Sequence, residues 1–158
     1  NKAIALKPDY VIALENLGRL YRSEKEFGKA QGVLEQALKA DPANADLHYD
    51  LGMVFAMQDE APRARTYLEQ ATALRPDYAE AWNNLGVLSV KSGDTEGALK
   101  AFERCVEIAP DYAPGYLNVA RAYVIVGDKQ KAAAALRELL KRHPDNAEAA
   151  AELARLNP

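Results

Sequence analysis

A proline recurs at a fixed interval of 34 residues along this 158-residue chain. The five prolines at this interval are Pro8, Pro42, Pro76, Pro110 and Pro144. A fixed period of this length is typical of stacked repeats, none of which can bury its apolar face alone. We therefore expect one domain over residues 1–158, with repeats at about 11–44, 45–78, 79–112 and 113–146 and partial pieces at 1–10 and 147–158.

Each repeat carries two apolar stripes with helical spacing. The first stripe occupies the sixth, ninth, tenth and thirteenth residues after the proline, for example Trp82, Leu85, Gly86 and Ser89. These offsets fall on one face of an α-helix. A second stripe follows the breaker residues that separate the two helices. First helices are expected near 11–24, 45–58, 79–92 and 113–126, and second helices near 27–40, 61–74, 95–108 and 129–142.

Local signals refine these helices. Glycine stands at the tenth position in three repeats, as Gly18, Gly52 and Gly86. Because glycine inside a helix costs about 1 kcal/mol relative to alanine, its recurrence predicts close approach of a neighbouring helix. The spacings of Asp77 to Glu80 and of Asp145 to Glu148 predict capping boxes.

The pattern of large residue, Leu, Gly, Tyr, Ala, Phe, Ala and Pro resembles the tetratricopeptide repeat (TPR) family. Trp82, Leu85, Gly86, Ala98 and Phe102 match it in one repeat. The resemblance implies an all-α, right-handed α-solenoid of TPR helix pairs, with a concave wall lined by the first helices. Departures from the pattern are Leu14 and His48 in the large slot, Ser89 in the aromatic slot and Leu139 in a small slot.

Composition and motifs argue against several classes of function. The net charge of −3 and the lack of a Lys/Arg run argue against nucleic acid. No apolar stretch is long enough for direct membrane insertion. The residues show no catalytic constellation, metal-ligand spacing or phosphate loop, so neither an enzyme nor a cofactor is expected. Cys105 is expected to be a buried small residue, and as the only cysteine it allows no intrachain disulfide.

The start of the sequence bears on the compartment. Since the chain begins at Asn1 without Met, we interpret it as a fragment or a processed chain. Its compartment stays open.

The face of each first helix opposite the core stripe supplies the candidate site. The predicted peptide-binding residues are Asn16, Arg19, Tyr49, Asp50, Met53, Asn83, Asn84, Val87, Asn118 and Arg121. A side-chain amide both donates and accepts, so asparagines at one recurring slot could hold a peptide backbone. Alternatively, these amides bond to neighbouring helices or water. Exposed apolar residues such as Met53 and Val87 either contact a ligand or fill gaps between first helices.

Two resemblances within the TPR family bear on the ligand. Asn16, Asn84 and Asn118 are similar to the asparagine ladder in the TPR superhelix of O-linked N-acetylglucosamine transferases, and Asp50 interrupts it. The carboxylate clamp of heat-shock co-chaperones requires basic residues where this chain has Glu15 and Glu80, so clamp function is rejected.

These observations favour a module that binds a protein or an extended peptide in its concave groove. Two alternatives stay open. One is a structural or assembly scaffold that self-associates through exposed repeat ends or the convex face. The other is a substrate-docking region of a larger enzyme such as a glycosyltransferase. The piece at 147–158 is expected to be either a cap or the start of a fifth repeat.

Overall fold

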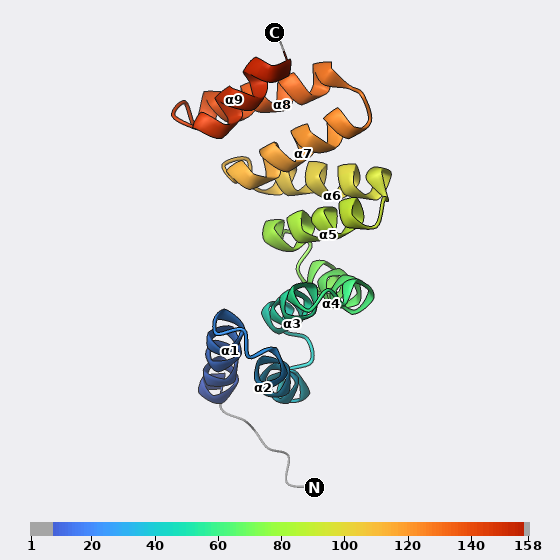
Figure 1. Cartoon of the computed structure of the whole chain (residues 1–158). Helices are drawn as coiled ribbons and strands as arrows, with labels where there is room; N and C mark the ends of the chain where they lie inside the picture. The colour runs from blue at the N-terminus through green and yellow to red at the C-terminus, as the bar shows by residue number, and fades with distance from the viewer. Residues whose placement is uncertain (1–7, 157–158) are drawn as a thin grey trace, which may run out of the picture. The chain divides into compact units, whose positions relative to one another are not determined.

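The computed structural model describes residues 8–156, which form nine α-helices and contain no strand (Figure 1). In chain order the helices are α1 (Pro8–Ser23), α2 (Phe27–Ala40), α3 (Ala45–Met57), α4 (Ala61–Leu74), α5 (Ala79–Lys91), α6 (Thr95–Ile108), α7 (Ala113–Ile125), α8 (Lys129–Arg142) and α9 (Ala147–Leu156). The all-α helical repeat predicted from the sequence is confirmed. Residues 1–7 of the expected partial piece at 1–10 lie outside the described residues.

The 34-residue period predicts the helix bounds closely. All four second helices coincide with their expected ranges, and α3, α5 and α7 each end one residue early. The largest difference is in α1, which begins three residues before its expected start.

The predicted capping boxes are wrong. Tyr78, not Asp77, stands at the N-cap of α5 and makes no side-chain capping bond. Before α9, the Oδ1 atom of Asn146 accepts from the backbone N–H of Ala149 at 2.9 Å. Asp77 and Asp145 lie in the turns that precede these helices, so each stands too far from the helix start to cap it.

Working caps occur at other polar residues. Asn44 accepts from two backbone N–H groups of α3, while Asp94 and Asp128 each accept from one, in α6 and α8. Each satisfies N–H groups that the first helical turn leaves without partners.

The turn inside each of the four helix pairs contains one residue in the left-handed region. Gly93 and Gly127 hold this position with φ of 78° and 83°, which confirms the predicted breakers. Lys25 and Asp59 hold the same position in the first two pairs with φ of 62° and 58°. The left-handed conformation is unfavourable for a residue that carries a Cβ atom, but not for glycine.

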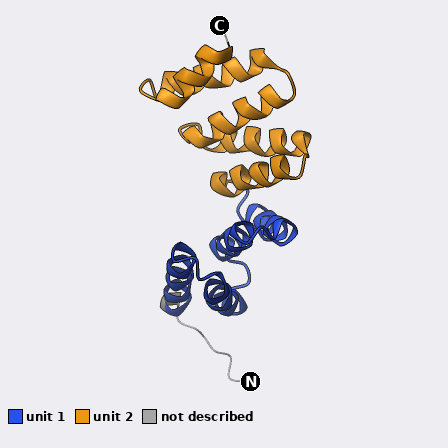
Figure 2. Ribbon diagram, in the orientation of Figure 1, with its two compact units in different colours: residues 1–76 blue, residues 77–158 orange. Residues whose placement is uncertain are grey.

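The chain divides into two compact units, residues 1–76 and 77–158 (Figure 2). In unit 1, helices α1 and α2 pack as one pair and α3 and α4 as another, with α2 against α3. In unit 2, α5 pairs with α6 and α7 with α8, α6 packs on α7, and α9 packs on α8. Within each unit, the helices thus pack mainly on their neighbours in sequence.

The recurring helix glycines allow close packing inside the pairs, as predicted. A Cβ atom built on Gly18 would stand 2.5 Å from Cγ of Leu34, and one on Gly52 would stand 2.8 Å from Cγ of Leu68. In unit 2, the corresponding neighbour of Gly86 is the ring of Phe102. These second-helix side chains are buried and form the centre of each pair.

Candidate functional site

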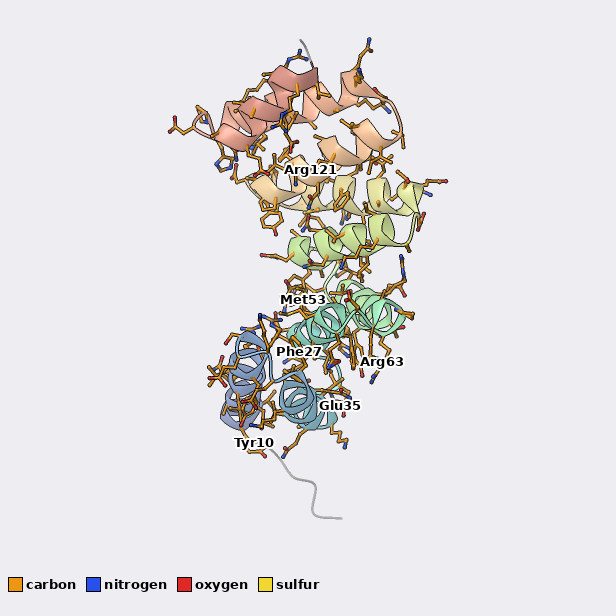
Figure 3. All side chains as sticks on the ribbon, in the orientation of Figure 1. Tyr10, Phe27, Glu35, Met53, Arg63 and Arg121 are labelled. Atoms are coloured by element: carbon orange, nitrogen blue, oxygen red, sulfur yellow. The ribbon has the colours of Figure 1, made fainter. Side chains whose placement is uncertain are left out.

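The predicted site residues lie on first helices of both units. Asn16 and Arg19 are on α1, and Tyr49, Asp50 and Met53 are on α3. Asn83, Asn84 and Val87 are on α5, whereas Asn118 and Arg121 are on α7. Figure 3 labels Met53 and Arg121 among the side chains. The structure brings Arg19 to Asp50 in unit 1 and Asn83 to Asn118 in unit 2.

In unit 1, Asp50 is the centre of an ion-pair cluster. Arg19 Nε donates to its Oδ2 atom at 2.6 Å, and Arg22 Nη1 donates to its Oδ1 atom at 3.0 Å. Arg19 also pairs with Glu15 at 2.6 Å. Only 1% of Asp50 is exposed, and burial raises the pKa of its carboxyl group more than the two arginines lower it.

This cluster joins α1 to α3 and determines what unit 1 can offer a ligand. Both carboxylate oxygens of Asp50 are engaged, so the residue can act on a ligand only through the partly exposed guanidinium of Arg19. Asn16 is exposed, while Tyr49 and Met53 are half-buried.

In unit 2, the asparagine amides already have partners in the chain. Asn118 Nδ2 donates to Asn83 Oδ1 at 2.8 Å, and Asn84 Nδ2 donates to the backbone oxygen of Glu80 at 2.9 Å. The bond between Asn118 and Asn83 matches the alternative in which the amides bond to neighbouring helices, and both bonds leave fewer groups to hold a peptide backbone. Neighbouring first helices bring the two amides of Asn83 and Asn118 into contact, and Asn84 bonds back onto its own helix.

The amide of Asn118 nevertheless keeps an acceptor. A primary amide oxygen offers two lone pairs, and the Oδ1 atom of Asn118 has no hydrogen-bond partner among residues 8–156. Asn118 is part-buried, so this acceptor lies at the helix surface rather than in the core.

Two adjoining apolar hollows lie along α7. The α5–α7 hollow has a volume of about 190 Å³ and is lined by Val87, Val90, Lys91, Phe102, Asn118, Arg121, Ala122 and Ile125. The α7–α9 hollow has a volume of about 270 Å³ and is lined by Ala120, Arg121, Val124, Ile125, Leu136, Glu152, Arg155 and Leu156. Arg121 and Ile125 belong to both, so the two hollows share a wall.

The exposed apolar side chains of this face lie in these hollows. Val124 is 46% exposed and Ile125 is 58% exposed. Val90 is also exposed, whereas Val87 is half-buried and packs against the cluster around Phe102. For Val87, the sequence left open whether the side chain contacts a ligand or fills a gap between first helices. Its half-buried packing shows that it partly fills such a gap, whereas Val90, Val124 and Ile125 are exposed.

Arg121 is held by α9. Its Nε and Nη2 atoms donate to Glu152 Oε1 at 2.9 and 2.6 Å, and Nη2 donates to Glu148 Oε1 at 2.5 Å. Hydrogen bonds from the guanidinium to Glu152 raise the pKa of Arg121. Charge-assisted bonds of this kind fix a side chain in one geometry. The side chain of Arg121 is therefore held in one conformation, in which it lines both hollows.

Sequence reasoning missed the contribution of α9. Glu148, Glu152, Arg155 and Leu156 complete the α7–α9 hollow, yet none was predicted as a site residue. The available signal was a charge pattern, since two acidic residues one helical turn apart follow Arg121 by roughly one repeat. Leu153 and Leu156 of α9 also pack against the cluster that contains Leu136.

Features that would suggest other chemistry are scarce in the described residues. The Cys105 side chain is fully buried, as expected, and burial raises the pKa of its thiol to about 11. Between residues 8 and 156 no group of three His, Cys, Asp or Glu residues could hold a metal ion. Within the same range, no helix has the length and apolar character needed to cross a membrane.

Paired antiparallel helices at a 34-residue period, with a recurring glycine in the first helix, define an all-α helical-repeat protein. The chain belongs to the tetratricopeptide repeat family, whose model matches residues 21–88 and 89–156. TPR proteins are protein-interaction modules. A comparison with curated proteins found no match.

Several solved structures are similar to this chain. MamA is 27% identical with a TM-score of 0.79, over 93% of this chain and 86% of that one. YrrB, described as a TPR protein with an unusual peptide-binding site, is 26% identical with a TM-score of 0.75, over 93% and 76%. PilF of Pseudomonas aeruginosa is 23% identical with a TM-score of 0.84, over 94% and 68%, which shows the fold alone.

Proposed function

We propose that this chain is a non-catalytic module whose first-helix face in unit 2 binds an extended peptide or protein segment. The observation that carries the proposal is the pair of adjoining apolar hollows on α7, one on each side of Arg121. Burying a large apolar side chain there removes its surface and that of Val124 and Ile125 from water, which is the main driving force for association.

The polar groups beside the hollows suit a peptide backbone. The unpaired Oδ1 atom of Asn118 can accept from a ligand N–H, and Asn118 lines the α5–α7 hollow. A few well-placed polar groups in a mainly apolar site are the usual arrangement for orienting a ligand. The similarity to YrrB, with its described peptide-binding site, supports the same class of ligand.

Unit 1 offers a second, more polar face. This face on α1 and α3 includes Asn16, Tyr49, Met53 and the partly exposed cation Arg19. We assign this face a supporting role in binding, because Asp50 already engages Arg19.

The test is a selection from a display library of random short peptides on the full chain, followed by titration of the selected peptides. Val124→Ser and Ile125→Ser remove apolar surface from the hollows and should weaken binding about tenfold when combined. Val126→Ser is the matched control, because Val126 is 49% exposed in the turn after α7 and lines neither hollow.

Two results would overturn the proposal. One is a selection that enriches no peptide. The other is a set of peptides that bind the Val124→Ser/Ile125→Ser variant as tightly as the parent chain, with circular dichroism showing both chains equally folded. Concentration-dependent self-association that the double substitution abolishes would assign the hollows to a second copy instead.

A further inference from the structure

The charge on the rim of the α7–α9 hollow indicates what kind of segment fits. We propose that this hollow takes one bulky aliphatic side chain of a partner segment, and that Arg155 pairs with an acidic residue next to it. The recognised element is thus an aliphatic residue flanked by Asp or Glu. This inference rests on the proposed function and specifies the chemistry of its ligand.

The apolar part of the hollow is built to receive a side chain. Leu136 of α8 is 1% exposed and forms its floor, while Val124 of α7 and Leu156 of α9 stand at its sides. Ala120 lines the same space, and its small side chain leaves room where a larger residue would fill it. No polar group of the described residues is left unpaired inside this floor. The space therefore favours an apolar group without hydrogen-bonding needs.

The charges around the hollow are not equivalent. Glu152 and Arg121 neutralise each other through the bonds between α7 and α9. Arg155 also lines the hollow, one helical turn beyond Glu152, and has no hydrogen bond or ion pair with any residue between 8 and 156. An unpaired guanidinium beside an apolar surface is a site for a carboxylate, which it binds with fixed geometry.

The neighbouring charges reinforce this preference. Lys91 and Arg121 line the adjoining α5–α7 hollow, and no acidic residue lines it. A basic segment would meet Arg155 and would find Glu152 already paired with Arg121. Charge complementarity therefore selects an acidic partner.

The experiment uses the full chain and three fluorescein-labelled peptides. The reference peptide is Gly-Ser-Asp-Leu-Asp-Ser-Gly, the second replaces its Leu with Ala, and the third replaces both Asp with Lys. Fluorescence anisotropy measures each dissociation constant at low and at high salt. The Ala peptide should bind about tenfold more weakly than the reference, because the aliphatic side chain supplies most of the affinity.

Charge reversal identifies Arg155 as the recognising group. Arg155→Glu should weaken the reference peptide by about two- to fivefold and strengthen the Lys peptide by a similar factor, and both effects should shrink at high salt. The matched control is Arg137→Glu, because Arg137 is an exposed arginine of α8 that lines neither hollow. It should leave all three dissociation constants unchanged.

The outcomes separate this inference from the proposed function. Equal binding of the three peptides, no binding of the reference up to about 1 mM, or indifference to Arg155→Glu overturns the acidic-aliphatic ligand. If library-selected peptides still bind and still depend on Val124 and Ile125, the proposed function stands without it. Sedimentation velocity of the chain alone provides a further check, since a dimer that Arg155→Glu dissociates would make a second copy the occupant.

Discussion

The recurring glycine of the first helices allows a test in which two predictions have opposite signs. Alanine is favoured over glycine in a helix by about 1 kcal/mol, so helix propensity alone predicts that Gly18→Ala stabilises α1. The packing predicts the reverse. A Cβ atom on Gly18 would stand 2.5 Å from Cγ and 2.6 Å from Cδ2 of Leu34, whose side chain is fully buried. Because Cγ is the branch point of that side chain, a rotation at its tip cannot relieve the clash.

Overpacking of this kind costs about 1–3 kcal/mol. Gly32→Ala in α2 is the matched control, because Gly32 belongs to the same helix pair and has nothing within 4 Å of an added Cβ atom. It should raise the free energy of unfolding by up to about 1 kcal/mol. The two variants should therefore differ by the overpacking cost, with Gly18→Ala the less stable.

Urea titrations followed by far-UV circular dichroism give the free energies of unfolding. A double-mutant cycle sharpens the test, since Leu34→Ala removes the atoms that the new methyl group meets. The loss in Gly18→Ala/Leu34→Ala should be smaller than the sum of the two single losses. A Gly18→Ala chain as stable as Gly32→Ala, or strictly additive losses, would refute the close-approach explanation of the glycine.

Three further predictions concern other residues. Because burial raises the pKa of Asp50 in the folded state, the stability that this carboxyl group contributes is present at low pH and is lost as pH rises through the raised value. Asp50→Asn should therefore gain stability relative to the parent chain as pH rises above the unfolded pKa of about 4, and urea titrations at a series of pH values check the sign. The Cys105 thiol should react with a disulfide reagent only after urea unfolds the chain, because it is buried with a pKa of about 11; rapid reaction of the native chain would contradict this. Lys25→Gly should raise the free energy of unfolding by up to about 1 kcal/mol, since it removes a side chain from a residue in the left-handed region. Gly93→Ala should lower the free energy of unfolding by a similar amount, and urea titrations measure both changes.

The period of the sequence was enough to predict the helices, because each helix boundary follows from local chemistry. Glycine and aspartate mark the turns after α5 and α7, and apolar spacing determines which face is buried. The capping boxes failed for a local reason as well. The spacing of Asp77 to Glu80 fits the motif, but the turn that contains Pro76 and Asp77 delays the helix start to Ala79.

The candidate site was harder to predict because it depends on how helices approach one another. The slot of Asn118 was recognised, yet its bond to Asn83 depends on the register between α5 and α7. The role of Asp50 was likewise hidden, since only the fold brings Arg19 and Arg22 to it from α1. The α7–α9 hollow was missed entirely, because its lining comes from three helices and no pattern within one repeat encodes it.

The packing of α9 has a consequence for dynamics. This helix packs on α8 and is tied to α7 through Arg121, so it can open while the packing of α5 on α6 is kept. Local opening of one helix requires less free energy than global unfolding, and amide hydrogen exchange reports it directly. Since Glu152, Arg155 and Leu156 complete the α7–α9 hollow, each opening of α9 abolishes that hollow. A ligand bound in the hollow must therefore slow amide exchange along α9. The degree of slowing measures the affinity of the ligand through the exchange rates of the protein's own amides.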